Sequence, residues 1–356
     1  MGMAGLTLAQ RDFAATQEQL GRWFSGHLGH AATVPQLTVA NVSGGWSSES
    51  LLATVSSERG THDYIVRIPP SGGGLFAEYD LEGQTRTQEL LRGHGIPTPS
   101  PLYYEADPGW IGSKFLVMPR IEGHIPGDMT YARKGWLHDA PEDVQRRAHD
   151  GFLLTLAALQ RVSPESAPWL QRPTGPGVAA ELAWWREYVS WGTDNNVPDM
   201  MLDAFDWLAN NLPAEEAEPA VCWGDARMSN MIFDDGGGIV GVLDWEQACL
   251  CPAEADFAWW LATRRQMLAV HGIDADPELP GFDSRSRVID HYQEMIGRQL
   301  NNLEWYEHFA MVRIGCCTLR IQVLLRALGQ GDHFLTRAPI LPPWTIEAVQ
   351  ARGPIA

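Results

Sequence analysis

The chain has 356 residues, of which 45% are hydrophobic and 20% are charged, and this length and composition predict an ordinary globular protein with two domains or lobes. The formal net charge of −18 argues against nucleic acid as a partner, because such binding needs a basic surface that displaces phosphate counterions. The five cysteines form no C-x-x-C pair, which favours free thiols over disulfides or a zinc site.

The N-terminal end carries no recognisable targeting signal. Residues 1–13, MGMAGLTLAQRDF, lack the basic segment and apolar segment of a signal peptide, and no apolar run approaches transmembrane length. We therefore expect a cytoplasmic protein with no membrane partner. Residues 7–28 place apolar side chains at helical spacing and predict an N-terminal helix.

Alternating apolar residues between positions 37 and 68 predict an antiparallel meander of three strands. The turn between the first two strands contains Gly44, Gly45 and Ser47. Glycines there let the backbone approach phosphate groups and offer N–H donors, although a Gly-Gly turn by itself is usually only a hairpin turn.

The third strand, YIVRIPP, places a single cation within an apolar alternation. Arg67 lies between Val66 and Ile68 and therefore shares the opposite face with Ile65. A solvent-facing arginine is the ordinary interpretation, and a cation that reaches a bound phosphate is the functional one. Residues 76–93 then predict a helix, and a turn and two strands follow, the second of them spanning residues 115–118.

Beyond residue 123 the pattern becomes helical. The segments that predict helices are 141–162, 178–192, 199–212, 254–271, 284–300, 302–330 and 343–351. Tryptophans are conspicuous in this part of the chain, and such aromatics are more often core than ligand cage. They are Trp184, Trp185, Trp191, Trp207, Trp245, Trp259, Trp260 and Trp305.

Residues 221–261 carry the chemistry. A loop with Asp225 and Asn230 precedes the strand at 231–233, and a glycine turn and a second strand, 239–243, lead to Asp244. Phosphoryl transfer needs one carboxylate that orients the attacking hydroxyl, plus an amide oxygen and a second carboxylate that hold Mg²⁺ on the phosphates. Each residue alone is explained by turn or strand-end chemistry, but their order and spacing match a kinase catalytic loop and metal-binding Asp.

The segments WGDARMSN and VLDWE resemble the aminoglycoside phosphotransferase family, small-molecule kinases with a protein-kinase-like fold that include choline and homoserine kinases. The family pattern is HGD-x-x-x-x-N, a hydrophobic strand, and then L/I-D-W/F-D/E. Trp223 stands where the family has His, and an indole donates one hydrogen bond but accepts none, so the loop must be supported differently.

The resemblance implies an α+β fold of two lobes. The first, residues 1–118, would be an antiparallel β-rich lobe that binds the nucleotide, and the second, residues 124–356, a helical lobe with the inserted catalytic hairpin and the acceptor site. Between them, residues 119–123, PRIEG, resemble the family's M-E-R-V-D-G hinge, where adenine meets backbone groups.

The resemblance also implies roles for individual residues. Those expected to contact ATP are Gly44, Gly45, Ser47, Arg67, Pro119 and Ile121. The helix partner of Arg67 is open among Gln84, Glu82 and Glu78.

In the second lobe, Asp225 would orient the substrate hydroxyl and Arg227 would stabilise charge on the transferred group, while Asn230 and Asp244 would hold Mg²⁺. Asp256 matches a family Asp that we expect to hydrogen-bond the catalytic-loop backbone.

The expected function is ATP- and Mg²⁺-dependent transfer of the γ-phosphate to a hydroxyl of a small molecule. One alternative is a metabolite kinase that acts on an amino alcohol or a sugar. Another is a catalytically silent nucleotide-binding regulator, suggested by Trp223 and by the lack of a clear helix Glu. The acceptor, the choice between ATP and GTP, and the oligomeric state stay open.

Overall fold

The computed structural model describes residues 12–28, 36–39, 47–57, 60–70, 74–128 and 130–351. The chain divides into two units, one made of Met1–Glu89 with Pro99–Ile121 and the other of Leu90–Thr98 with Glu122–Ala356. The division after Ile121 falls inside the segment expected to be a hinge. Residues 90–98 group with the second unit, whereas the sequence predicts them as part of the first lobe, residues 1–118.

An antiparallel sheet of five strands forms the centre of the first unit, in the order β1-β2-β3-β5-β4. The strands are β1 (Gln36–Val39), β2 (Glu49–Ser57), β3 (Gly60–Ile68), β4 (Tyr103–Glu105) and β5 (Phe115–Pro119). The predicted meander of three strands is confirmed, because β1 pairs antiparallel with β2 and β2 with β3.

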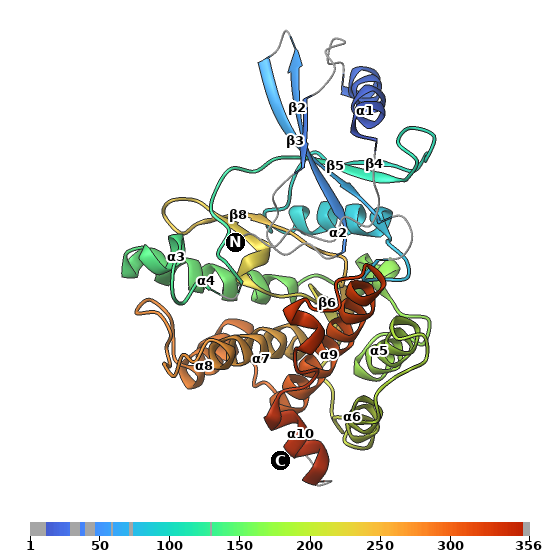
Figure 1. Cartoon of the computed structure of the whole chain (residues 1–356). Helices are drawn as coiled ribbons and strands as arrows, with labels where there is room; N and C mark the ends of the chain where they lie inside the picture. The colour runs from blue at the N-terminus through green and yellow to red at the C-terminus, as the bar shows by residue number, and fades with distance from the viewer. Residues whose placement is uncertain are drawn as a thin grey trace. The chain divides into compact units, whose positions relative to one another are not determined.

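The two faces of this sheet pack against different helices (Figure 1). Helix α1 (Phe13–Leu28) buries Trp23 and Phe24 on the face that carries Val66. Helix α2 (Leu81–Gly93) places Leu81 on the other face, against Leu116, which pairs with Arg67 across β3 and β5.

Helix α2 begins later than predicted, and residues 7–11 of the predicted N-terminal helix lie outside the described residues. Asp12 accepts a hydrogen bond from the Ala15 N–H (3.0 Å) and Asp80 accepts one from the Gly83 N–H (2.8 Å), so each Asp caps the first turn that follows it. Helix α2 therefore starts at Leu81 and not at position 76, and Glu78 lies ahead of the helix.

The second unit is helical, as predicted, and each long predicted segment contains one helix. The helices are α3 (Trp136–Asp139), α4 (Glu142–Leu159), α5 (Val178–Gly192), α6 (Asp199–Asn210), α7 (Glu254–Val270), α8 (Arg285–Ile296), α9 (Leu303–Ala327) and α10 (Pro343–Ala351). Helix α8 ends before the predicted residue 300 because Gly297 adopts a left-handed conformation (φ 70°).

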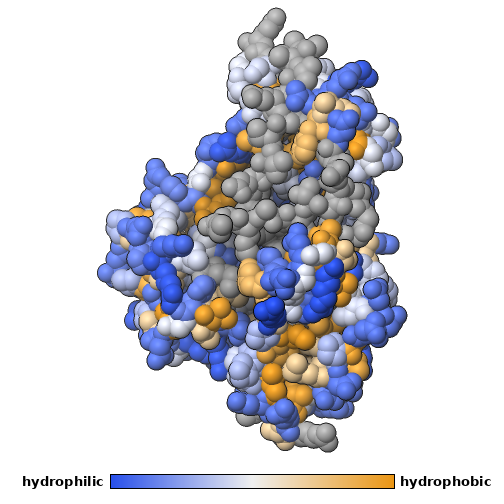
Figure 2. Space-filling view, viewed as in Figure 1, coloured by the Kyte–Doolittle hydropathy of each residue, from blue (hydrophilic) through white to orange (hydrophobic). Residues whose placement is uncertain are grey.

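Helix α9 alone, among the residues that the structure describes, is long and apolar enough to cross a membrane by length and composition. Buried residues make up 72% of its most apolar window, as in the core helix of a globular unit. Hydrophilic residues cover much of the surface shown in Figure 2, with hydrophobic residues gathered in its lower part.

Most of the conspicuous tryptophans are core residues, as the sequence interpretation preferred. Those with exposures of 8% or less are Trp185, Trp207, Trp245, Trp259, Trp260 and Trp305. The five cysteines are free thiols.

Candidate active site

Two short antiparallel strand pairs lie between α6 and α7, and the 221–261 segment contains nearly all of both pairs and the first half of α7. One pair is the predicted hairpin, β7 (Met231–Phe233) with β8 (Ile239–Val242). The other pair, β6 (Ala220–Cys222) with β9 (Cys249–Cys251), was not predicted, because strands of three residues leave too little alternation to recognise. β6 ends immediately before the Trp223-Gly224-Asp225 loop, so the pair fixes where this loop starts.

The backbone of Gly224 packs closely against the backbone of Gln247. Its φ is +84°, and a Cβ at this position would lie 2.0 Å from the carbonyl oxygen of Gln247. Asp256 accepts hydrogen bonds from the N–H groups of Trp223 (2.6 Å) and Gly224 (2.8 Å), which confirms the contact expected for it. On the other side, the Arg313 guanidinium donates to the Gly224 carbonyl (2.6 Å).

Two buried groups of opposite charge therefore bind Gly224, Asp256 at its N–H and Arg313 at its carbonyl. Burial raises the pKa of Asp256 from its ordinary 3.8 to about 6, against the lowering effect of the two N–H donors and of Arg313. Arg313 itself is 3% exposed and lies on α9, far along the chain from the loop.

Three side chains hold the carboxylate of Asp225, which is 5% exposed. Its Oδ2 accepts hydrogen bonds from Arg227 Nη2 (2.5 Å) and Asn230 Nδ2 (3.0 Å). Its Oδ1 accepts one from the indole Nε1 of Trp259 on α7 (3.0 Å). The structure thus brings Asp225, Arg227 and Asn230, all singled out from the sequence, into direct contact.

Arg227 lies between two carboxylates. Its Nη1 donates to Asp128, and Asp128 also accepts a hydrogen bond from the Ser229 hydroxyl (2.9 Å). Burial lowers the pKa of Arg227, but Asp225, Asp128 and Asp244 outweigh this effect, and the net shift is upward. Arg227 therefore carries a fixed positive charge among three carboxylates, and the group as a whole is formally negative.

Backbone contacts bring Asp244 to the same place. The Leu243 N–H donates to the Asn230 carbonyl (2.9 Å), and the Trp223 indole Nε1 donates to the carbonyls of Leu243 (2.9 Å) and Asp244 (3.1 Å). Asp244 has a left-handed φ of 65°, a conformation that such contacts stabilise in a non-glycine residue. The indole at 223 thus supports the loop by donation and by stacking on Trp245 (5.4 Å between ring centroids).

Asn230 and Asp244 suit a magnesium ion by their chemistry. The amide nitrogen of Asn230 donates to Asp225, so its carbonyl oxygen is the atom that could bind a metal ion. An amide oxygen and a carboxylate are hard ligands, and Mg²⁺ is usually held by one or two such groups together with substrate phosphates. Within the described ranges no cluster of three or more His, Cys, Asp or Glu residues could hold a metal ion.

The nucleotide residues expected from the sequence belong to the first unit. Gly44 and Gly45 lie outside the described residues, and Ser47 is buried. Arg67 is partly buried on β3 and pairs with Ser50 on β2, while Pro119 is the last residue of β5.

The helix candidates for the partner of Arg67 differ in exposure. Gln84 is 6% exposed and lies on α2, whereas Glu82 on the same helix and Glu78 before it are exposed. Their pairing with Arg67 stays a prediction, and so does the nucleotide contact of Ile121.

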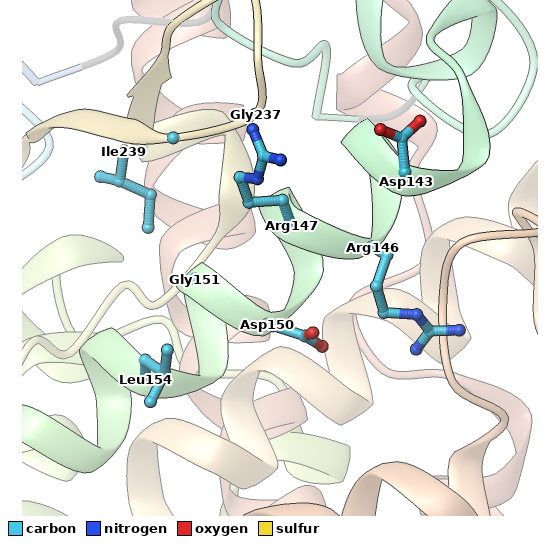
Figure 3. Close-up of a pocket in the computed structure, with 9 residues that line it drawn as sticks. Asp143, Arg146, Arg147, Asp150, Gly151, Leu154, Gly237 and Ile239 are labelled. Carbon is cyan, nitrogen blue, oxygen red and sulfur yellow. The ribbon is translucent and has the colours of Figure 1, made fainter.

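A surface hollow of about 420 Å³ lies elsewhere on the second unit, between α4 and the turn of the β7–β8 hairpin. Figure 3 shows Asp143, Arg146, Arg147 and Asp150 on the helix beside Gly237 and Ile239 of the hairpin. It contains none of the predicted site residues, and we assign it no role.

Sequence reasoning missed Asp128, Trp259 and Arg313. The sequence marks Trp259 only as one of a group of aromatic residues, and no motif marks Asp128 or Arg313. They lie 97 positions before, 34 after and 88 after Asp225 by sequence number, outside the range of any local motif. Only packing of the second unit shows that they contact the loop.

The comparisons with known proteins define the family. Residues 38–287 match the model of the phosphotransferase enzyme family (APH), a span of more than half of the chain. The chain therefore belongs to this family of kinase-like enzymes, and the resemblance inferred from the motifs is confirmed.

Solved structures define the fold as protein-kinase-like. A Ralstonia eutropha protein described as a "putative aminoglycoside phosphotransferase" is 19% identical, with a TM-score of 0.66 over 96% of this chain and 99% of that one. The aminoglycoside phosphotransferase APH(3'')-Id of Streptomyces rimosus, solved with ADP and streptomycin, is 18% identical, with a TM-score of 0.50 over 77% of this chain and 94% of that one. At these identities the likeness shows the fold alone.

A curated relative has a different name. Acyl-CoA dehydrogenase family member 11 of Gallus gallus is 29% identical over 216 residues, which are 60% of this chain and 27% of the relative. The chain thus spans about a quarter of the length of that protein.

Proposed function

We propose that the protein transfers the γ-phosphate of ATP, with Mg²⁺, to a hydroxyl group of a small molecule. The observation that carries this proposal is the direct contact of Asp225 with Arg227 and Asn230. Asp244 follows Leu243, whose backbone N–H donates to the Asn230 carbonyl. Membership of the phosphotransferase family supports it. We also keep the cytoplasm as the proposed location.

The contacts support a proposed role for each residue of the site. The Asp225 carboxylate accepts a hydrogen bond from the acceptor hydroxyl and orients its oxygen toward the γ-phosphorus, because phosphoryl transfer depends on positioning in line. Arg227 neutralises charge on the transferred phosphoryl group. Asn230 and Asp244 would hold Mg²⁺, which supplies charge neutralisation on the phosphates when bound. Ser47, Arg67, Pro119 and Ile121 are proposed to bind the nucleotide.

The acceptor has two candidate classes. The neighbour from Streptomyces rimosus was solved with streptomycin, which makes an aminoglycoside one candidate. The curated relative with a matching region is named for acyl-CoA dehydrogenation, which makes a hydroxylated acyl thioester another. Amino alcohols and sugars are the acceptors expected if the protein is instead a metabolite kinase.

A panel of hydroxyl compounds, assayed for nucleotide consumption with ATP or GTP and Mg²⁺, tests the proposal. The compounds are streptomycin, choline, a hexose and a hydroxyacyl thioester, and the variants are Asp225→Asn and Asp235→Asn. Asp235 is a matched control because its side chain is 99% exposed in the hairpin turn. We expect turnover with one class, lost in Asp225→Asn and kept in Asp235→Asn. Nucleotide binding without turnover on any compound would favour a silent regulator.

A further inference from the structure

The side chain of Trp259 meets the proposed catalytic carboxylate from a helix outside the motif. Its indole Nε1 lies 3.0 Å from Asp225 Oδ1, and its ring is 3% exposed on α7. Tryptophan has one hydrogen-bond donor and no acceptor, so this contact uses the whole polar capacity of the side chain.

The hydrogen bonds on Asp225 are unequally divided between its two oxygens. A carboxylate offers about four lone-pair sites, two on each oxygen. Arg227 and Asn230 take two on Oδ2, and Trp259 takes one on Oδ1. The remaining site is therefore on Oδ1, next to the indole.

The position of the indole is itself fixed from a second helix. The Arg313 guanidinium lies 4.4 Å from the centroid of the Trp259 ring, and the same guanidinium donates to the Gly224 carbonyl (2.6 Å). One buried cation thus links the ring to the loop that carries Asp225. A cation over an indole face is attractive, and more so when both groups are desolvated.

We propose that Trp259 is a positioning residue for phosphoryl transfer: its indole N–H orients Asp225 so that Oδ1 receives the acceptor hydroxyl. This inference rests on the proposed function and adds a specific oxygen and a specific donor to it. A turn of the carboxylate plane about the Cβ–Cγ bond would move Oδ1 away from the indole N–H, and the hydrogen bond from Trp259, together with the donors on Oδ2, opposes that movement. The hydrogen bond from Trp259 should therefore raise kcat, by aligning the acceptor hydroxyl, and should leave nucleotide binding unchanged.

The test compares Trp259→Phe with Trp260→Phe. Phenylalanine keeps a ring beneath Arg313 but removes the N–H. Trp260 is the neighbouring buried indole on α7, and its ring packs on Phe152 (4.9 Å between centroids). With the best acceptor of the panel, or with water as acceptor, we expect kcat of Trp259→Phe to fall roughly ten- to a hundredfold, the effect of one hydrogen bond to a charged group.

We expect the KM for ATP to stay within twofold of the unsubstituted protein (about 0.4 kcal/mol or less), and Trp260→Phe to keep its kcat. If Trp259 had only a structural role, both variants would lose thermal stability, and Trp259→Phe would not show a lower kcat at an unchanged KM for ATP. Equal kcat values for the two variants would overturn the proposal.

A second measurement does not depend on turnover. The indole N–H resonance of Trp259, assigned by its absence from Trp259→Phe, is expected to shift in Asp225→Asn, because its acceptor loses a full charge. An unchanged resonance would refute the contact. If the unsubstituted protein phosphorylates no acceptor, the proposed function fails, while this resonance still decides whether Trp259 holds Asp225.

Discussion

Replacing Gly224 by alanine is the sharpest test of the loop geometry. The residue has a φ of +84°, and an added Cβ would lie 2.0 Å from the Gln247 carbonyl oxygen, where contacts below 3.0 Å force a movement. Gly297 is a matched control, since its φ is +70° and a Cβ there meets nothing within 4 Å. Both variants place an alanine in a left-handed backbone conformation, but only Gly224→Ala adds a steric clash.

The magnitudes follow from these two terms. A left-handed alanine costs about 1–2 kcal/mol, and reduced freedom of the unfolded chain returns about 0.4–1 kcal/mol, so Gly297→Ala should lose about 1 kcal/mol. Overpacking adds roughly 1–3 kcal/mol at Gly224. The loop must also move by about 1 Å beside Asp225, and a misplacement of that size costs on the order of a hundredfold in rate.

Urea unfolding and steady-state kinetics of both variants measure these terms. We expect Gly224→Ala to be the less stable of the two and to lose kcat, while Gly297→Ala keeps its kcat. Equal stabilities together with full activity of Gly224→Ala would refute the close approach of the loop to Gln247.

Three further outcomes follow from the site. Asp128→Asn should lower kcat roughly tenfold with little loss of stability, because Arg227 loses one of two anchors; steady-state kinetics check this, and an unchanged kcat would remove Asp128 from the site. Trp223→His restores the family residue yet should destabilise the protein by roughly 2–4 kcal/mol in urea unfolding, because a fully buried indole is lost; a gain in stability would contradict this. Burial raises the pKa of Asp256 from 3.8 to about 6, so the stability that this group contributes is present below about pH 4 and is lost as pH rises through about 6. At 1.36 kcal/mol per pKa unit, the free energy of unfolding should fall by about 3 kcal/mol over this range. Asp256→Asn should therefore show a flatter dependence of unfolding free energy on pH between 4 and 7, and a parallel dependence would refute the shift.

The sequence predicted the elements whose signals are local. The meander depends on alternation over nine-residue strands such as β2 and β3, and the helices of the second unit depend on apolar spacing over long segments. The order of Asp225, Asn230 and Asp244 predicted a group that the structure does bring together, because a hairpin of two short strands necessarily returns the chain to its starting point.

Other features depend on packing between distant segments and left no local signal. Arg313 reaches the Gly224 carbonyl from α9, and Asp128 reaches Arg227 from a segment before α3. The consequence of Trp223 was also open, since the sequence showed only that an indole cannot accept a hydrogen bond. The structure shows two carbonyls that need a donor there.

Asn230 and Asp244 are proposed to hold a magnesium ion on a nucleotide whose phosphate Asp225 directs to an acceptor. Calorimetric titration with a non-hydrolysable ATP analogue, with and without Mg²⁺, tests it most directly in the unsubstituted protein, Asp244→Asn and the exposed control Asp235→Asn. We predict that Mg²⁺ tightens nucleotide binding in the unsubstituted protein and the control but not in Asp244→Asn. The same Mg²⁺ effect in all three proteins would contradict a role of Asp244 in holding the ion.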